Sequence, residues 1–341
     1  MYIRYNFLEL FFFSLGKIPS QLLINRPMSK LTNFLPLFIL AQVVTANSEF
    51  SWIDTKGTHI DLLYGDQKIA RYVYEQMKPE ERERTYKPFF HLYDKKGEKF
   101  VTKGPGGKFT HHRGIYYGFS KCAALDGNGN KVSVDTWHCK RGYQTHEKVL
   151  HQHADSKKAS LQSEIAWRVD DGTVFITEMR TLTFKFDKEG RLQIDFDSIL
   201  STTQPKVTLD GDPQHAGFQF RASNEVAEST AKQTFYIRPI DGKDEMGKTK
   251  NWPQNKDMTN LDWKAQSVVI QGQRYFTVYL DHPQNPKPSF YSERDYGRFG
   301  SYFKSSVTAD STLSVKYRLI FGTKPLSAEK CEEYSIAFRS E

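Results

Sequence analysis

The sequence predicts an all-β protein, a large antiparallel β-sandwich. Three stretches carry this prediction, because apolar and polar residues alternate along each of them with a period of two. Such a period places successive side chains on opposite faces, as in a strand with one buried face. Turns rich in Gly, Asp and Asn separate the stretches, as expected for antiparallel strands. The three stretches are residues 161–169, 192–200 and 313–321.

Composition agrees with this fold class. The chain has 341 residues, 38% hydrophobic and 14% aromatic, which is enough for a large core. The net charge is +8, but Lys and Arg are scattered among Asp and Glu, so we expect a solvated surface and no nucleic-acid partner. We find no internal repeat and no helical periodicity beyond about ten residues. We therefore expect residues 47–341 to form a single β-sandwich domain.

Residues 1–46 have the pattern of an N-terminal extension followed by a signal peptide. A basic start near Lys30 precedes an apolar core at 34–44, and small residues up to Ala46 follow. The apolar core is shorter than the roughly 20 residues that span a bilayer. We expect cleavage near Ala46, an exported protein in the periplasm or outside the cell, and no stable membrane span after cleavage. Residues 1–27 would be an upstream extension.

Further strands are expected along the chain in order. Residues 60–65 and 68–75 predict a strand pair, and residues 89–93 predict a third strand that runs into a turn. Residues 110–121 then combine two histidines, an arginine and two glycines with an aromatic run. Imidazole, guanidinium and close-approach glycines suit a site, and the aromatic run suits a strand beneath it.

The predicted strand at 174–186 breaks its own pattern. Glu178 and Arg180 fall on its apolar face, between hydrophobic neighbours. Charges inside a sheet are costly unless they are paired. Either the two form a buried ion pair or this face opens into a polar cleft, and we favour the cleft.

Three cysteines, Cys122, Cys139 and Cys331, lie far apart without C-x-x-C spacing, which argues against a structural zinc site. A disulfide between Cys122 and Cys139 stays open as a possibility.

Other polar side chains gather near turns. In residues 212–221, Ala216, Phe218 and Phe220 share one face and leave His215, Gln219 and Arg221 on the other. Rigid polar loops are common places for a site on a sandwich. The further candidates for substrate contacts are Trp137, His138, His282, Asn285, Arg294 and Tyr296.

Taken in order, these motifs resemble the bacterial family labelled methane oxygenase PmoA, over residues 60–321. The motifs are His111-His112-Arg113-Gly114, Trp137-His138, Glu178 with Arg180, Gly211-Asp212-Pro213-Gln214-His215-Ala216-Gly217, Asp281-His282-Pro283-Gln284-Asn285-Pro286 and Arg294-Asp295-Tyr296-Gly297. Many relatives carry Asp-His-Pro before the histidine pair, where this chain has Lys108-Phe109-Thr110. A multi-span oxygenase needs repeated apolar runs, and a mean hydropathy of −0.62 with 26% charged residues excludes methane oxidation in a membrane.

The side chains suit a secreted carbohydrate-active protein, since sugars need polar groups beside an aromatic platform. The set is also similar to the aldose-epimerase-like sandwiches, and this resemblance implies a histidine acid and a carboxylate base. Glu178 would be the base and His215 or His111 the acid. His112, Arg113 and Arg180 join the substrate contacts named above, with Arg113 and Arg294 holding substrate oxygens. A lyase, an epimerase and a hydrolase stay open as reactions.

Two alternatives belong to other classes. One is a non-catalytic module that binds a glycan, a small molecule or an envelope partner with the same residues. The other is a metal-dependent, copper or iron oxygenase-like protein, with His111 or His112, His138, His215 or His282, and Glu178 as ligands. Among these candidate ligands, no H-x-H or H-E-x-x-H spacing supports a metal. We therefore expect no cofactor and keep the metal as the alternative.

Overall fold

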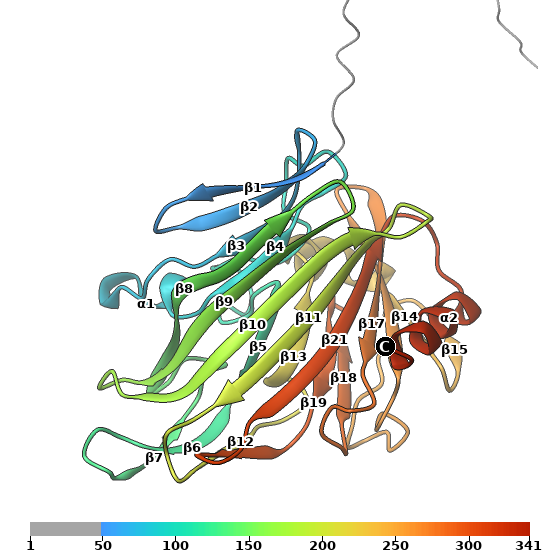
Figure 1. Ribbon diagram of the computed structural model, residues 1–341. Helices are drawn as coiled ribbons and strands as arrows, with labels where there is room; N and C mark the ends of the chain where they lie inside the picture. Colours follow the sequence, from blue (N-terminus) through green and yellow to red (C-terminus); the bar gives the residue numbers. More distant parts are fainter. Residues whose placement is uncertain (1–48) are drawn as a thin grey trace, which may run out of the picture. The chain divides into compact units, whose positions relative to one another are not determined.

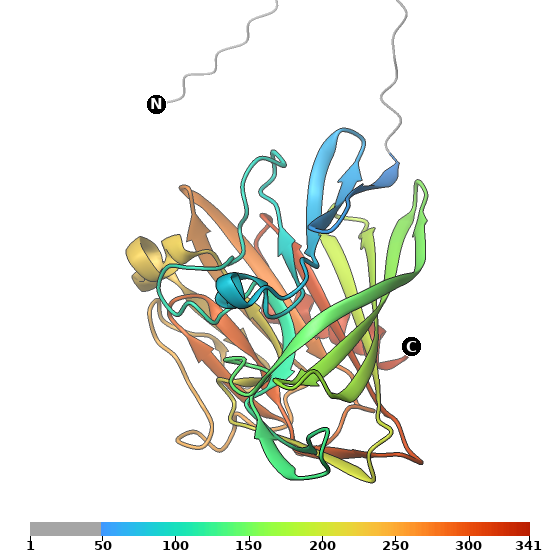
Figure 2. The ribbon, with the colours of Figure 1, turned by 90° about the vertical axis from the view of Figure 1, so that its left-hand side faces the viewer.

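Two large antiparallel sheets face each other across a shared apolar core (Figure 1, Figure 2). The computed structural model describes residues 49–341, so the predicted signal peptide at 1–46 lies outside the described residues. In Figure 1 the nine-stranded sheet lies in front, with β5, β13, β18 and β19 of the eight-stranded sheet behind it. The prediction of a large antiparallel β-sandwich is confirmed.

The nine-stranded sheet contains the strands with the clearest alternation. Its order is β15-β14-β16-β17-β21-β11-β10-β9-β8. These strands are β8 (Gly142–Ala154), β9 (Lys158–Val169), β10 (Val174–Phe186), β11 (Leu192–Ser201), β14 (Phe235–Arg238), β15 (Gly242–Lys243), β16 (Trp263–Ile270), β17 (Gln273–Asp281) and β21 (Leu313–Gly322).

The eight-stranded sheet carries the histidine loops. Its order is β1-β2-β3-β4-β5-β13-β19-β18. These strands are β1 (Phe50–Thr55), β2 (His59–Tyr64), β3 (Gln67–Val73), β4 (Phe89–Leu92), β5 (Ile115–Phe119), β13 (Ala216–Arg221), β18 (Phe290–Arg294) and β19 (Arg298–Tyr302).

A small sheet and a few short helices complete the described chain. The small sheet has the order β20-β12-β6-β7. Its strands are β6 (Lys121–Leu125), β7 (Lys131–Val134), β12 (Lys206–Asp210) and β20 (Ser305–Thr308). The helices are η1 (Pro79–Glu81), α1 (Arg82–Thr85), η2 (Val226–Thr230), η3 (Ala231–Gln233) and α2 (Ala328–Arg339).

Alternation along β5 and β13 decides what each face of the eight-stranded sheet carries. Tyr117 and Phe119 of β5, with Phe218 and Phe220 of β13, point into the core between the sheets. Their neighbours in sequence therefore point to the outer face of the sheet, away from the nine-stranded sheet. The site described below lies on this outer face.

The helix α2 was missed by the sequence analysis. It packs over β14, β16, β17 and β21, where Cys331 and Phe338 join a separate apolar cluster with Trp263 and Ile320. No helix within residues 49–341 has the length and apolar character needed to cross a membrane.

The three cysteines are buried free thiols, so the disulfide left open between Cys122 and Cys139 is not formed.

Candidate functional site

Three histidines from three separate loops meet on the outer face of the eight-stranded sheet. They are His111, His138 and His215, and one nitrogen of each lies within 4.8 Å of the others. Their ring centroids are 4.4 Å apart for His111 and His138, 4.9 Å for His138 and His215, and 5.9 Å for His111 and His215. We call these three residues the three-histidine cluster. All three are among the candidate residues predicted from the sequence.

His111 is placed by a strained loop before β5. Phe109 has a φ of 59°, a conformation that a bulky residue rarely adopts, and the amide of His112 donates to its carbonyl. Arg113 fastens the same loop, since its guanidinium donates to the carbonyl oxygens of Thr110 and His112 at 2.6 and 2.8 Å. Arg113 thus holds backbone in position and does not face outward for a substrate.

His138 and His215 are each oriented by an aspartate three residues earlier. Asp135 accepts hydrogen bonds from the amides of Trp137 and His138 through Oδ1, and its Oδ2 lies 2.7 Å from Nδ1 of His138. Asp212 likewise lies 3.1 Å from Nδ1 of His215. An aspartate that caps its own turn leaves its second oxygen for the following ring. Because Nδ1 is occupied, Nε2 of both rings is the nitrogen left for a ligand.

A glycine fixes how His215 enters its strand. Gly217 has a φ of 79°, and a Cβ there would lie 2.0 Å from the carbonyl oxygen of Ser301. Real side chains do not tolerate such an approach, so β13 lies against β19 only because position 217 is glycine. This contact fixes the height of His215 above the sheet.

The surroundings of His111 favour its neutral imidazole. Burial, followed by the neighbouring His138 and Lys87, lowers the pKa of His111 to about 3. Burial also lowers the pKa of Lys87 to about 7. His111 Nε2 is buried without a hydrogen-bond partner among the described residues. A neutral ring with a free nitrogen can act as a metal ligand or a proton acceptor.

Aromatic side chains flank the cluster. The Trp137 ring lies 6.4 Å from those of His112 and His215, and the Tyr296 ring lies 6.1 Å from that of His112. A depression of about 480 Å³ opens beside the cluster. It is lined by Arg82, Glu83, Tyr86, Thr110, His111, His138, Cys139 and Lys140.

Glu178 and Arg180 do not belong to this site. Glu178 is 0% exposed and accepts hydrogen bonds from Arg180 Nε at 2.8 Å, Trp167 Nε1 at 2.9 Å and Ser198 Oγ at 2.9 Å. Both carboxylate oxygens thus accept two hydrogen bonds each inside the sandwich. The expected polar cleft at this strand is wrong, and the buried ion pair is the correct interpretation.

Three other candidates also lie apart from the cluster or are engaged elsewhere. The ring of His282 packs 5.1 Å from that of Phe338 in α2. Asn285 Nδ2 donates to the carbonyl oxygen of Lys316, and the amide of Lys316 donates to Asn285 Oδ1, both at 2.7 Å. Arg294 donates to the carbonyl oxygen of Glu293 at 3.2 Å.

Some residues of the site were not selected from the sequence. Asp135 and Asp212 were missed, although two Asp-x-x-His segments were a usable signal. Arg221 and Arg298, on the outer face beside Tyr296, were not selected either. A lone arginine on a strand carries no spacing that marks it as part of a site.

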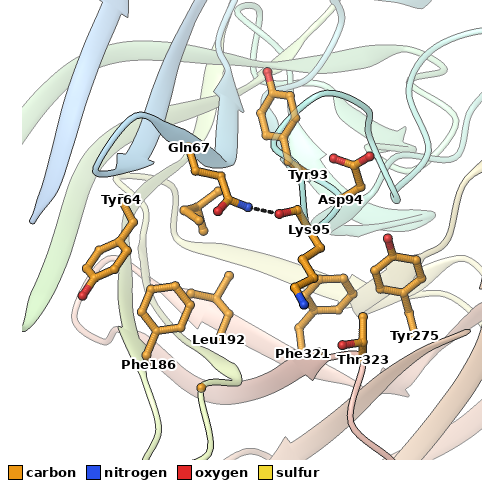
Figure 3. A pocket seen from close by; sticks show the side chains of 13 residues that line it. Tyr64, Gln67, Tyr93, Asp94, Lys95, Phe186, Leu192, Tyr275, Phe321 and Thr323 are labelled. Atoms are coloured by element: carbon orange, nitrogen blue, oxygen red, sulfur yellow. Dashed lines mark hydrogen bonds between the residues drawn. The ribbon is translucent and has the colours of Figure 1, made fainter. Parts of the chain in front are cut away.

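A second pocket lies at another end of the sandwich, with a volume of about 250 Å³ (Figure 3). Aromatic rings dominate its walls, including Tyr64, Phe186, Tyr275 and Phe321. Within the described chain its charged lining is limited to Asp94 and Lys95. Its lining is therefore mainly aromatic and apolar.

The fold and the site define a β-sandwich protein with an open cluster of three histidines. The chain belongs to a family of unknown function, DUF6807, which matches residues 59–335. The resemblance to the family labelled methane oxygenase PmoA is therefore wrong. No curated protein matches the sequence.

Solved structures similar to this chain include an aldose epimerase homologue and a galactose mutarotase-like protein. An aldose epimerase homologue from C. elegans has 7% identity and a TM-score of 0.37, covering 81% of this chain and 99% of that one. A galactose mutarotase-like protein from Lactobacillus casei has 6% identity and a TM-score of 0.36, covering 80% of this chain and 100% of that one. At such low scores neither similarity identifies a site or an activity.

Proposed function

We propose that the three-histidine cluster binds a divalent first-row transition metal, with one or more coordination positions open to the depression. The observation that carries this proposal is the approach of His111, His138 and His215, whose ligand nitrogens lie within 4.8 Å of one another. Three protein ligands with an open position are typical of catalytic metal sites. Imidazole suits zinc, copper, iron and nickel.

The surroundings fit such a centre. A tetrahedral site with bonds of about 2.1 Å brings its nitrogens to about 3.4 Å from one another, so the rings must close in slightly. His138 and His215 have side chains 26% and 29% exposed, which leaves them room to move. The carboxylates on their Nδ1 atoms raise ligand basicity and fix the tautomer.

The substrate class proposed for this centre is an oxygen-rich small molecule such as a carbohydrate. A bound metal would polarise a hydroxyl or carbonyl oxygen of the substrate. Trp137 and Tyr296 offer aromatic faces beside the histidines. The proposal includes export of the protein, which is expected from the apolar signal-peptide core at residues 34–44.

A second candidate uses the same residues without a metal. The pairs His138–Asp135 and His215–Asp212 have the geometry in which a carboxylate orients a histidine for acid–base work. On this account His215 and His111 exchange protons with a sugar. Glu178, the base chosen from the sequence, takes no part, because it is sealed in the core.

Elemental analysis tests the first candidate against the second. The purified protein is stripped with a chelator, incubated separately with Zn²⁺, Fe²⁺, Cu²⁺ or Ni²⁺, and desalted. We expect about one metal ion per chain, with affinity falling at least about tenfold in His138→Ala and in His215→Ala. His282→Ala is the matched control, since it removes a buried histidine elsewhere. If none of the four metals is retained stoichiometrically, the metal proposal is wrong and acid–base chemistry replaces it.

A further inference from the structure

Two buried arginines lie opposite each other on neighbouring strands beside the three-histidine cluster. Arg221 is the last residue of β13 and Arg298 the first of β19, and they are direct register partners. Each is 1% exposed. Like charges directly opposite destabilise a sheet, and a buried charge is costly without a counter-charge. This pair therefore calls for an anion.

In each guanidinium, Nη1 donates hydrogen bonds, and the edge formed by Nε and Nη2 has no partner among residues 49–341. Nη1 of Arg221 donates to the carbonyl oxygen of Ala222 at 2.7 Å, and Nη1 of Arg298 donates to Gln219 Oε1 at 3.1 Å and Ser292 Oγ at 3.0 Å. Nε and Nη2 of both arginines are buried without a hydrogen-bond partner in the described part of the chain. These two N–H groups form the parallel fork that fits both oxygens of a carboxylate.

Four other buried arginines have carboxylate partners. Arg180 pairs with Glu178 at 2.8 Å, and contacts with acidic side chains also neutralise Arg191, Arg238 and Arg318. Within residues 49–341, Arg221 and Arg298 have no such ion pair. Within residues 49–341, Arg113 is a third buried arginine without a carboxylate, but both of its Nη atoms donate to backbone carbonyl oxygens. Arg221 and Arg298 differ from it because each leaves both Nε and Nη2 without a partner.

A third group with free nitrogens lies between the arginines and the cluster. His112 is 3% exposed, and neither of its ring nitrogens has a partner among residues 49–341. Its ring lies 4.4 Å from that of His111 and 6.1 Å from that of Tyr296. The guanidinium of Arg221 in turn lies 4.7 Å from the Tyr296 ring centroid. Tyr296 therefore connects the arginine pair to the histidines.

We propose that Arg221, Arg298 and His112 form an anion-binding cradle that takes the carboxylate of an acidic sugar or a related hydroxy acid. The free edges of the two arginines bind the carboxylate oxygens, and His112 contacts the adjoining part of the ligand. The hydroxyl groups of the same molecule then reach the three-histidine cluster. This inference rests on the proposed function for that second contact, whereas anion binding by the cradle needs no metal.

The side chain of Phe109 lies against His112 and Tyr296, beside the arginine pair. Phe109 is 36% exposed, and its ring lies 5.4 Å from His112 and 4.8 Å from Tyr296. It follows Gly106 and Gly107, both at positive φ, in the loop before β5. Displacement of the Phe109 ring gives a ligand access to the arginine edges, so Phe109→Ala should speed association.

Calorimetry with glucuronate and glucose tests the cradle, because the two sugars differ by a carboxylate. We expect the wild-type protein to bind glucuronate at least tenfold more tightly than glucose, both after chelator treatment and after zinc loading. Inorganic sulfate should compete with glucuronate. Arg221→Met and Arg298→Lys should each abolish the preference, and Arg221→Met should keep or raise the unfolding midpoint, because it removes an unpaired buried charge. Arg318→Lys, at a paired buried arginine, is the control that keeps the preference.

Equal binding of the two sugars by the wild type would overturn the inference, as would a preference that survives both arginine variants. The result for metal retention is read independently of the glucuronate preference. A glucuronate preference in a protein that retains no metal supports the cradle and refutes the metal centre, and metal retention without the preference does the reverse.

Discussion

The buried pair of Glu178 and Arg180 gives the sharpest prediction about stability. Glu178→Gln keeps the shape of the side chain but removes its charge, which leaves the Arg180 guanidinium uncompensated at 2% exposure. The glutamine also has one acceptor oxygen fewer, since an NH₂ group in place of Oε2 can accept from neither Trp167 nor Arg180. The variant should therefore lose stability without losing function.

The magnitude follows from the burial of both partners. Removing one member of a fully buried ion pair costs about 3–5 kcal/mol, because the other charge stays in the core. Replacing both members with apolar residues is often close to neutral. The double variant Glu178→Gln/Arg180→Met should therefore regain part of the loss, and a double-mutant cycle gives the coupling.

Urea unfolding at pH 7 measures the effect, with metal content and sugar binding measured on the same samples. Glu164→Gln is the matched control: this glutamate lies on neighbouring β9, is partly exposed and faces Lys148 at 3.4 Å, so it should cost less than about 1 kcal/mol. We expect Glu178→Gln to keep ligand and metal binding. A loss below about 1 kcal/mol together with lost binding would refute the structural role and restore Glu178 to the site.

Three further predictions concern the site and its supports. Asp135→Asn should weaken metal affinity by about 10–100-fold, because it removes the carboxylate that orients His138; unchanged affinity would contradict this role. Gly217→Ala should destabilise the protein by more than about 2 kcal/mol, since its Cβ would meet the Ser301 carbonyl; a midpoint equal to wild type would show that β13 shifts freely. Burial lowers the pKa of Lys87 to about 7. Between about pH 7 and 10 the unfolded state therefore binds more protons than the folded state. The free energy of unfolding of the wild type should rise over this range by at most about 1.4 kcal/mol per pH unit. Lys87→Met should lack this rise in urea unfolding at pH 6.5 and 9, and parallel curves for the two proteins would contradict it.

Much of the fold could be read from the sequence, because half-buried antiparallel strands leave a period of two. The strand at 313–321 is an example, and β21 covers Leu313–Gly322. The helix α2 could not be read in this way. Its buried residues are Cys331, Ser335 and Phe338, so the serine interrupts the apolar stripe that would identify a helix.

The site was only partly predictable. Its histidines stand in three loops that are far apart in sequence, and they meet because β5 pairs with β13 and the loops fold back over the outer face. A period of two tells which residues share a face, but not which strands become neighbours. For the same reason the pattern could not reveal that Arg221 lies opposite Arg298, or that Glu178 is sealed in the core by Trp167 and Ser198.

X-ray absorption at the zinc edge of the loaded protein tests the three-histidine centre most directly. We expect three imidazole nitrogens at about 2.0–2.1 Å and one or two oxygen ligands from solvent. The number of imidazoles should fall to two in His215→Ala and stay at three in His282→Ala. A wild-type spectrum without imidazole scattering, or one that His215→Ala leaves unchanged, would contradict the account.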